Sequence, residues 1–424
     1  MKKIVLLFLI FFYCINLQKI SCEELSLEKA IEIALINNSD WKINQKIQEN
    51  AIFQKKKSEA ALFPAIGLSL NYSKTKKDTI ASSASENYSN SLSLNQNIYN
   101  RKVRLLIDQA ELSINQSKYN NIKVKHEIIL NVKKAYYGIL KLQARLDTHN
   151  EKLLRDKEQL KYAENLLNMG KAIKSEVLRA EITLEKTKQN LNTTRNELKS
   201  AKMTLSNILG VSIDNDFQYV SKDNLDNGIK KVIDEHFLLD EHVNKVTQNN
   251  YKLKIKNYAK EISSLNVKIA KTGHLPTVTG SSIYNWSNDK PDFKNKDWRV
   301  GVALSWTIFD AGLTNNSIRQ AENEKDKVEE EKYKLEKEIL LLIRRTYDEL
   351  EDLRSSLQIT KKSLELAEEN YNIVKVQYQN GLVSNLNLID AEVVYTEAKI
   401  NLLDAFYNYK IKLAEWEDAI GEEL

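Results

Sequence analysis

A seven-residue apolar period runs through the chain for long stretches, and it occurs twice. The first set of apolar residues seven apart is Val132, Ile139, Leu146, Leu153, Leu160 and Leu167. Adding 211 to each number gives a second apolar or aromatic set, namely Ile343, Leu350, Leu357, Leu364, Tyr371 and Tyr378. A heptad sustained over this length predicts α-helices packed as left-handed coiled coils.

Each heptad continues on the far side of a glycine turn. The continuing positions are Val177, Leu184, Leu191, Leu198 and Leu205, matched by Leu388, Tyr395, Leu402, Tyr409 and Trp416. The long stretches, Arg101 to Leu167 and Ala311 to Gln379, hold no Pro and one interior Gly each, Gly138 and Gly312, so each helix can extend ~100 Å. Their partners are Lys171 to Leu209 and Val383 to Ile420, each roughly 60 Å long. Each copy is therefore predicted to contain an antiparallel helical hairpin.

Landmarks outside the hairpins repeat at nearly the same offset. Phe63-Pro64 matches Leu275-Pro276 at offset 212, and Gly210 matches Gly421 at 211. We therefore expect two internal repeats, residues 23–210 and 241–424, with a connector at residues 211–240. Opening helices are expected at Ser26 to Ala61 and Glu241 to Lys271, interrupted at Asn37-Asn38 and Asn249-Asn250.

The N-terminus has the pattern of a secretory signal peptide, which we place at residues 1–22. Lys2 and Lys3 precede an apolar run from Ile4 to Ile15 that is too short to span a bilayer. Both cysteines of the chain, Cys14 and Cys22, lie in this segment, so cleavage after Cys22 leaves no thiol. The alternative is that Cys22 becomes a lipid-modified N-terminus.

Between each opening helix and its hairpin, the apolar period changes to two. The clearest alternation is Trp298, Val300, Val302, Leu304, Trp306 and Ile308, with small or polar residues between. Ile66, Leu68, Leu70 and Tyr72 alternate in the same way, and weaker strands are expected at residues 88–99 and 276–286. Strands with an apolar outer face and a polar inner face suit an outer-membrane barrel, although a soluble sheet shows the same alternation.

Four strands per chain cannot close a barrel, and open strand edges cannot stand in lipid. Three copies would give a closed twelve-stranded barrel, so the pattern favours an oligomer. The predicted fold class is mainly α with β.

Several motifs resemble those of a known family. They are the run Leu25 to Asn38, the Leu62-Phe63-Pro64 and Leu275-Pro276 before strands, Asn168 to Glu181, and Asn380 to Glu392. With the duplicated order of helix, strand pair and hairpin, they resemble the TolC-like outer membrane efflux proteins over essentially the whole mature chain. The resemblance implies a homotrimer with a transmembrane β-barrel in the outer membrane and an α-helical coiled-coil tunnel through the periplasm.

The resemblance also implies roles for residues near the two hairpin turns. The turns would dock a periplasmic adaptor that connects to an inner-membrane transporter, through Met169, Gly170, Lys171, Ala172, Asn380, Gly381, Leu382, Val383 and Ser384. The periplasmic aperture would be formed by Glu176, Tyr378, Asn387 and Asp390. Well-known members carry Arg where Val383 stands and Asp where Asn387 stands, so this chain lacks those groups for holding a closed state.

No signature of catalysis, metal binding or cofactor binding is found in the sequence. The closest histidines, His236 and His242, do not share one helical face as metal ligands would. A net charge of +5 built from interspersed signs lacks the basic face that nucleic-acid binding needs. The expected function is the exit duct of a tripartite efflux or type I secretion system; the alternatives are a periplasmic adaptor or a structural coiled-coil protein of the envelope. Neither the cargo nor the pump is encoded in a recognisable motif.

Overall fold

The computed structural model of the protein describes residues 24–76, 85–213, 217–220, 225–234, 250–288, 290 and 295–421. The predicted signal peptide, the possible lipidation site Cys22, and residues 235–249 of the connector and second opening helix lie outside the described residues. The chain forms two compact units, each assembled from both sequence copies. Unit 1 takes its residues from segments 1–42, 124–246 and 340–424, and unit 2 from segments 43–123 and 247–339.

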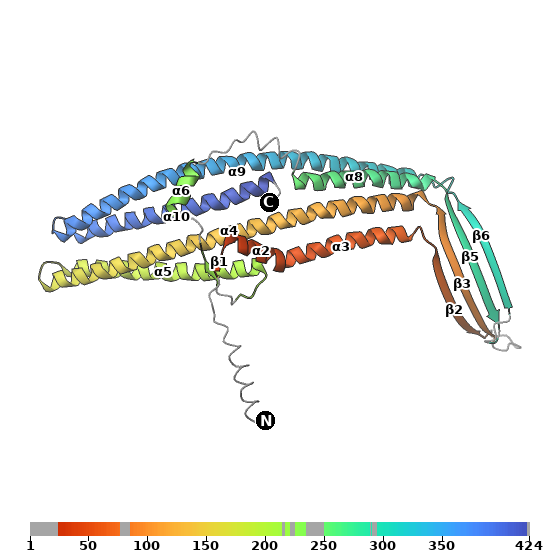
Figure 1. The fold of residues 1–424 in the computed structure, drawn as a ribbon, viewed down its shortest axis with the longest axis horizontal. Coiled ribbons are helices and arrows are strands. Elements are labelled where there is room, and N and C mark those ends of the chain that lie inside the picture. Colours follow the sequence, from red (N-terminus) through yellow and green to blue (C-terminus); the bar gives the residue numbers. More distant parts are fainter. Residues whose placement is uncertain are drawn as a thin grey trace, which may run out of the picture. The chain divides into compact units, whose positions relative to one another are not determined.

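Unit 1 contains the two predicted helical hairpins (Figure 1). The first hairpin is formed by α4 (Arg101–Asn168) and α5 (Lys174–Leu209), and the second by α9 (Leu313–Gln379) and α10 (Asn385–Ile420). Helices α4 and α9 begin in unit 2. These bounds agree with the sequence prediction to within three residues, because the breaks fall at glycines. Shorter elements complete the unit, namely β1 (Glu24–Leu25), α2 (Leu27–Asn37), β4 (Gln218–Tyr219) and α6 (Leu225–Asp234).

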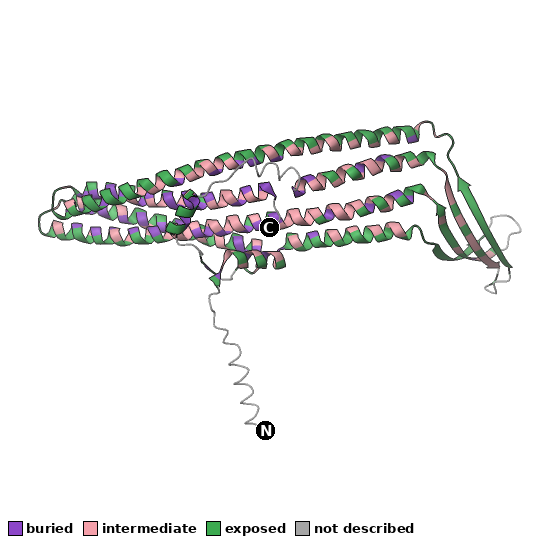
Figure 2. Ribbon diagram, turned by 45° about the horizontal axis from the view of Figure 1, so that its top comes forward, coloured by how far each residue is buried: buried purple, intermediate pink, exposed green. Residues whose placement is uncertain are grey.

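The heptad positions form the cores of these hairpins. Val132, Ile139, Ile343 and Leu357 are fully buried, and all the heptad positions within unit 1 are buried or half-buried. Figure 2 shows the buried residues as short stretches along helices that are otherwise intermediate or exposed. The coiled-coil periodicity in the sequence therefore corresponds to the observed packing.

Asn38 explains the break between α2 and α3 (Ser39–Ala60). Its side-chain oxygen accepts hydrogen bonds from the backbone N–H groups of Asp40 (2.8 Å) and Trp41 (3.2 Å). Its amide donates to the carbonyl of Ile208 at the end of α5 (2.8 Å). Gly210, at φ 68°, follows immediately, and a Cβ there would lie 2.6 Å from the Asn37 carbonyl oxygen. The helix break predicted at Asn37-Asn38 is thus a capping site joined to the end of the hairpin.

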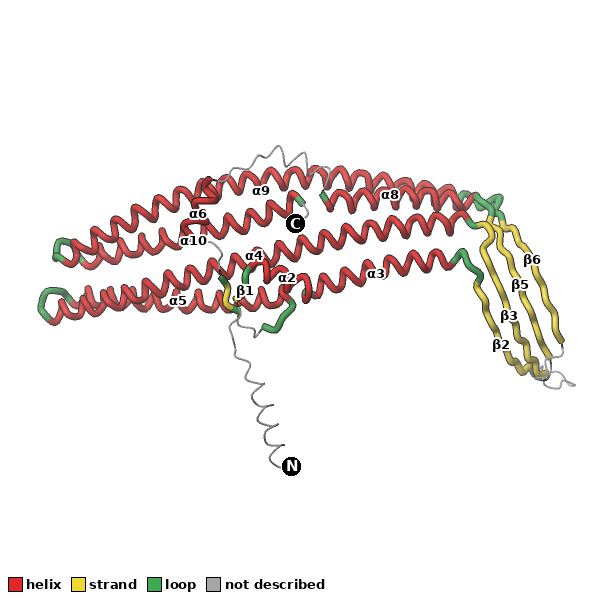
Figure 3. The backbone as a smooth tube through the Cα atoms, viewed as in Figure 1, coloured by secondary structure: helices red, strands yellow, loops and turns green. Residues whose placement is uncertain are grey.

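Unit 2 combines a helical part with an antiparallel sheet (Figure 3). Its remaining elements are α8 (Tyr251–Lys271), the short 3₁₀ helix η1 (Thr272–His274) and four strands, β2 (Ala65–Thr75), β3 (Ser85–Tyr99), β5 (Thr277–Asn288) and β6 (Asn295–Ser305). The strand order is β2-β3-β5-β6. The central β3–β5 pairing therefore joins a strand of the first sequence copy to a strand of the second.

Two details of the prediction are wrong. Gly312 is not inside a helix, because α9 begins at Leu313 and Gly312 has φ 87°. The Asp310 carboxylate accepts hydrogen bonds from the backbone N–H groups of Gly312 (3.0 Å) and Thr314 (2.8 Å), and this turn starts the helix. In addition, β6 ends at Ser305, so Trp306 and Ile308 follow the strand rather than extend it.

No helix in the described part of the chain combines the length and apolarity needed to cross a membrane.

Candidate functional site

The strand register places most of the large apolar residues of the four strands on one face of the sheet. Ile66 lies opposite Leu94, which continues through Ser282 to Val300. The next row runs from Leu68 through Leu92 and Tyr284 to Trp298. Residues directly opposite each other share a face, so four separate alternations combine into one surface.

This apolar sheet face is exposed in the single chain. Its members include Ile66, Leu68, Leu70, Tyr72, Leu92, Leu94, Tyr284, Trp298, Val300, Val302 and Leu304, all counted among the exposed large hydrophobic residues. Trp298 and Val302 retain 71% and 70% of their accessible surface. The other face carries small and polar residues, among them Gly67, Ser69, Ser93, Gly301 and Ala303. A continuous apolar face of this extent indicates contact with lipid or with another protein.

The two hairpin turns have the same backbone geometry. Gly170 and Gly381 both have φ 72°. At the first turn the N–H groups of Gly170 and Lys171 donate to the carbonyls of Leu167 (2.9 Å) and Leu166 (2.8 Å). At the second, Gly381 and Leu382 donate to Tyr378 (3.0 Å) and Gln377 (2.9 Å). Each turn is a Schellman motif, which needs a residue in the left-handed region and so favours glycine.

The turns differ in how the following helix starts. Before α10, the Ser384 hydroxyl donates to Asn387 Oδ1 (2.6 Å), and the Ser384 N–H donates to the same oxygen (3.3 Å). Before α5, the matching residue is Ile173, which provides no side-chain cap and is 66% exposed. Met169 and Leu382 are also exposed. The two helix starts therefore differ in capping: Ser384 makes a side-chain cap, whereas Ile173 exposes an apolar side chain at the matching position.

A series of polar contacts joins α4 to α10, which we call the α4–α10 seam. Starting far from the turns, its side-chain pairs are Lys133–Glu417, Lys134–Glu415, Lys141–Asn408, Arg145–Asp404, Lys399–Glu151, Arg155–Glu392 and Gln159–Asn385. The residue numbers rise on α4 as they fall on α10, as an antiparallel pair requires. Five of the seven contacts are ion pairs, and the contact closest to the turns is between two neutral amides.

Four charged side chains of this seam form a buried charge cluster, Lys152, Arg155, Asp156 and Glu392. The Arg155 Nε lies 2.8 Å from Glu392 Oε1, and Lys152 Nζ lies 2.7 Å from Asp156 Oδ1. The side chains of Glu392 and Asp156 are 2% and 0% exposed. Burial raises the pKa of the Glu392 carboxyl, and the neighbouring Lys152 and Arg155 oppose that rise. The two positive charges therefore compensate two carboxylates that water does not reach.

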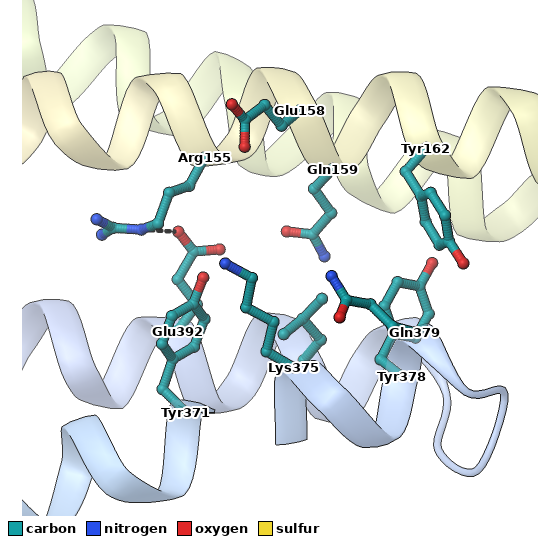
Figure 4. Close-up of a pocket in the computed structure, with 10 residues that line it drawn as sticks. Arg155, Glu158, Gln159, Tyr162, Tyr371, Lys375, Tyr378, Gln379 and Glu392 are labelled. Atoms are coloured by element: carbon teal, nitrogen blue, oxygen red, sulfur yellow. Dashed lines mark hydrogen bonds and ion pairs between the residues drawn. The ribbon is translucent and has the colours of Figure 1, made fainter. Parts of the chain in front are cut away.

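A cavity of about 220 Å³ adjoins this cluster on the side of the turns (Figure 4). Its walls include Tyr162 and Gln159 from α4, Tyr371 and Tyr378 from α9, and Glu392 from α10. The Tyr162 and Tyr378 rings meet edge to face with centroids 5.5 Å apart. The Tyr378 hydroxyl is buried without a hydrogen-bond partner among the described residues. Burial raises the pKa of Tyr378 to about 12, and the carboxylate of Glu176 adds to the rise.

The four predicted aperture residues all lie close to the hairpin turns, but their side chains differ in solvent exposure. Glu176 is half-buried, and its carbonyl accepts a hydrogen bond from the Asn385 side chain (3.3 Å). Tyr378 is buried, whereas Asn387 and Asp390 are exposed on the first turns of α10. The structure thus links Glu176 and Tyr378 and leaves Asp390 open to solvent in the single chain.

The sequence does not single out Arg155, Gln159, Asn385 and Glu392 as members of a site. They occupy polar positions outside the heptad, where a solvated helix face is the ordinary interpretation. No group of three or more His, Cys, Asp or Glu side chains in the described part of the chain is placed to hold a metal ion.

Comparison with known proteins connects this architecture to one family. The family model described as "Outer membrane efflux protein" matches the chain twice, over residues 30–211 and 243–422. The chain belongs to the outer membrane efflux protein family. It is an efflux channel of the outer membrane, and the family match leaves out only the two ends and residues 212–242.

Among curated relatives of the family, the chain is 22% identical over 382 residues to outer membrane protein TolC of Vibrio cholerae serotype O1, covering 88% of this chain and 86% of the relative. It is 23% identical over 394 residues to outer membrane protein TolC of Escherichia coli K12, covering 88% and 77% of the two chains.

The fold is shared with solved channels of the family. The structure resembles CusC with a TM-score of 0.81 at 16% identity, covering 93% of this chain and 92% of CusC. It resembles the CmeC outer membrane channel of Campylobacter jejuni with a TM-score of 0.81 at 18% identity, covering 93% and 85%. At these identities the likeness concerns the fold.

Proposed function

We propose that three copies of this chain assemble into an exit duct that carries substrates from an inner-membrane transporter and a periplasmic adaptor to the exterior. In this assembly the strands form a twelve-stranded barrel in the outer membrane. The helical hairpins form a coiled-coil tunnel in the periplasm. The observation that carries the proposal is the continuous apolar face across β2, β3, β5 and β6.

The strand directions support closure by identical copies. The strands alternate in direction along the order β2-β3-β5-β6, so the two edge strands β2 and β6 are antiparallel to each other. Strand β6 of one copy can therefore pair with β2 of the next and continue the antiparallel pattern. Closure in this way satisfies the backbone groups of both edges, which lipid cannot do. Strand lengths of 11 to 15 residues also suffice to span the membrane.

The turns are proposed as the adaptor-docking surface. Met169 to Ala172 and Asn380 to Ser384 lie at the ends of the hairpins, and Met169 and Leu382 expose apolar side chains there. A surface that combines exposed apolar residues with turn backbone groups suits a protein partner. Efflux by this chain would then depend on an energy source in the partner.

Membrane fractionation and gel electrophoresis of unboiled samples test the assembly. The duct predicts a species in the outer membrane that migrates as a detergent-resistant trimer and dissociates on boiling. An adaptor or structural coiled coil would instead be recovered without a strand-dependent trimer. Recovery as a soluble monomer would exclude the proposed duct.

The aperture can be tested by ion selectivity. A threefold axis would gather three copies each of Glu176 and Asp390 at the narrow end, and closely spaced carboxylates attract cations. Purified trimer in planar bilayers should prefer cations and be blocked by multivalent cations added from the periplasmic side. The double variant Glu176→Gln with Asp390→Asn should weaken both effects. Unchanged selectivity would place these carboxylates outside the conduction path.

A further inference from the structure

Four helix ends in unit 2 meet one edge of the sheet, and this edge is rich in basic side chains. The edge is formed by the strand ends that lead into the helices, namely Ala65, Tyr99, Thr277 and Ser305 (Figure 1). Exposed lysine and arginine side chains come from the last turns of α3 and α8 and the first turn of α4; they include Lys56, Lys57, Arg101, Lys102 and Lys268. The sheet is therefore bordered by positive charge where its strands give way to helices.

Two of these basic side chains are not engaged by the protein. The side chains of Arg101 and Lys102 are exposed and have no ion-pair or hydrogen-bond partner among the described residues. The carboxylate at the start of α9, Asp310, is instead occupied by its own turn. It accepts hydrogen bonds from the backbone N–H groups of Gly312 (3.0 Å) and Thr314 (2.8 Å) and from the Thr314 hydroxyl. The charges of Arg101 and Lys102 are thus available to an anion.

A cavity of about 350 Å³ is lined by Arg101 and Lys102. Its other walls come from the end of α8, η1 and the start of α9, and they include Leu275, Leu313 and Ser317. Leu275 and Leu313 are 41% and 70% exposed. The volume lies within the range of roughly 300 to 1,000 Å³ that is typical of small-ligand sites. Two cationic side chains beside exposed leucines suit a ligand that has an anionic part and an apolar part.

The connectors between strands and helices expose large apolar side chains next to this cavity. Phe63 precedes β2, and Trp306, Ile308 and Phe309 follow β6; all four are more than half exposed. The Trp306 indole N–H donates to the His274 carbonyl (3.1 Å), which ties this connector to the segment that forms one wall of the cavity. Aromatic residues at the ends of membrane strands lie at the level of the lipid headgroups. Basic residues at that level attract anionic lipids.

From this arrangement we infer that the cavity binds the headgroup of an anionic phospholipid, in the leaflet that faces the helices. Arg101 and Lys102 pair with the phosphate, and Leu275 and Leu313 contact the glycerol and the first carbons of the acyl chains. The inference rests on the proposed duct, because that assembly places the apolar sheet face in the outer membrane. At offset 211 the second copy has Gly312 and Leu313 in place of the two basic residues, so each chain has one such site.

Calorimetry on the full-length chain in a non-ionic detergent tests the site. Short-chain phosphatidylglycerol and phosphatidylcholine with identical acyl chains are titrated separately, below their micelle concentrations. We expect tighter binding of phosphatidylglycerol, because its headgroup carries a net negative charge and that of phosphatidylcholine does not. Inorganic phosphate is the third titrant. Phosphate binding as tight as that of phosphatidylglycerol would indicate a free-anion site and overturn the lipid assignment.

A charge variant and its matched control locate the binding. Arg101→Gln combined with Lys102→Gln should weaken phosphatidylglycerol binding roughly tenfold or more, because two basic contacts are lost, and should change phosphatidylcholine binding little. Lys327→Gln combined with Lys334→Gln removes the same charge from exposed positions of α9, about 20 Å or more from its start. This control should leave phosphatidylglycerol binding unchanged. Equal weakening in both double variants would mean a diffuse charge effect and overturn the site.

A third variant tests the cavity itself. Ser317→Trp fills the space between the helices and keeps every charge in place, so it should weaken the binding of both lipids. Unaltered phosphatidylglycerol binding in this variant would place the lipid elsewhere and overturn the inference.

The calorimetric measurement needs neither a barrel nor a trimer, so the two proposals can fail separately. Selective phosphatidylglycerol binding by a chain that forms no outer-membrane trimer would contradict the duct and leave the headgroup site intact. A normal trimer whose protein shows no preference for phosphatidylglycerol over phosphatidylcholine would overturn the site and leave the duct intact.

Discussion

The first hairpin (α4 and α5) and the second hairpin (α9 and α10) end in turns with the same backbone geometry. They differ in the side chains on the helix surfaces outside the heptad core. Gly170 and Gly381 share φ 72°, and the heptad cores match residue by residue at offset 211. Glu392 of α10 is buried against Arg155, whereas its counterpart on α5, Glu181, is exposed. The counterpart of Arg155 on α9 is Leu366, which is 55% exposed. The two hairpins therefore share their apolar heptad positions, and the surfaces outside those positions differ.

The polar surfaces of the two hairpins differ in which groups satisfy them. The α4–α10 seam is satisfied within one chain. The matching surfaces of α9 and α5 have no equivalent set of ion pairs among the described residues, and Ile182 and Leu366 stay exposed there. In the proposed trimer these surfaces would meet between neighbouring copies.

The largest effect on the free energy of unfolding is expected at Glu392, where the two hairpins differ most. Glu392→Ala leaves Arg155 and Lys152 facing one buried carboxylate, so it should lower the free energy of unfolding by about 3 kcal/mol. The matched change Glu181→Ala in the other hairpin should alter it by less than about 0.5 kcal/mol. Thermal denaturation of the purified proteins measures both. Equal effects would mean that the two hairpin faces are energetically equivalent.

In the strands, matched substitutions in the two sequence copies should have equal effects, because both copies contribute to one apolar face. Val302→Arg and its counterpart Leu92→Arg should each cost roughly 2 to 4 kcal/mol at the membrane midplane and reduce the amount of outer-membrane trimer. Ser305→Arg, on the polar face, should be tolerated. Quantifying trimer in outer-membrane fractions tests this, and equal tolerance of all three changes would contradict the assignment of a lipid-facing side.

The two turns can be compared by removing their glycines. Alanine at Gly170 or Gly381 must adopt a left-handed conformation at a cost of about 1 kcal/mol, and proline cannot adopt it at all. Gly381→Pro should abolish efflux while trimer levels stay unchanged, since the turn lies far along the chain from the strands. Gly170→Pro, measured in the same efflux and trimer assays, shows whether the first turn contributes equally to efflux. Gly138→Ala, inside α4 with no atom within 4 Å of the added methyl group, is the matched control.

If the trimer disappears in Gly381→Pro, the turn is needed for folding and the proposed docking role loses its support.

The smallest effect concerns Tyr378, whose counterpart in the first hairpin is Leu167. Because the Tyr378 hydroxyl has no hydrogen-bond partner, Tyr378→Phe should change stability by no more than about 1 kcal/mol at neutral pH. The native phenol has a pKa of about 12, whereas an unfolded tyrosine titrates near 10. The unfolded state therefore loses its proton first as pH rises above about 10, and native stability falls in that range.

Tyr378→Phe should remove this part of the loss of native stability at alkaline pH. Tyr162→Phe, which changes a more exposed ring, should not. Urea denaturation on either side of pH 10 distinguishes them. An identical alkaline loss in all three proteins would show that Tyr378 is not the group responsible.

The sequence was sufficient to predict the long helices and the four strands of the sheet because their signals are local, but it did not predict α6, β1 or β4. Glycines mark the turns, and the periods of seven and two identify the buried faces, so bounds such as Arg101–Asn168 fall within three residues of expectation. The α4–α10 seam could not be predicted in this way. Arg155 and Glu392 are 237 residues apart, and a heptad identifies an apolar face without naming the helix that packs beside it. Gly312 was misplaced because the apolar period does not record the left-handed backbone of Gly312 or the hydrogen bonds that the Asp310 carboxylate accepts before the helix begins.

The central pairing of β3 with β5 has a consequence for how many molecules must meet during assembly. Each chain already joins two copies of the strand pair covalently and aligns them through residues such as Leu92 and Tyr284. In the proposed trimer, a ring of six strand pairs would then be completed by an encounter of three molecules, with half of its joints formed during folding at a high effective concentration. The remaining joints depend on protein concentration in the membrane. Dilution should therefore slow ring closure without affecting how each protomer folds.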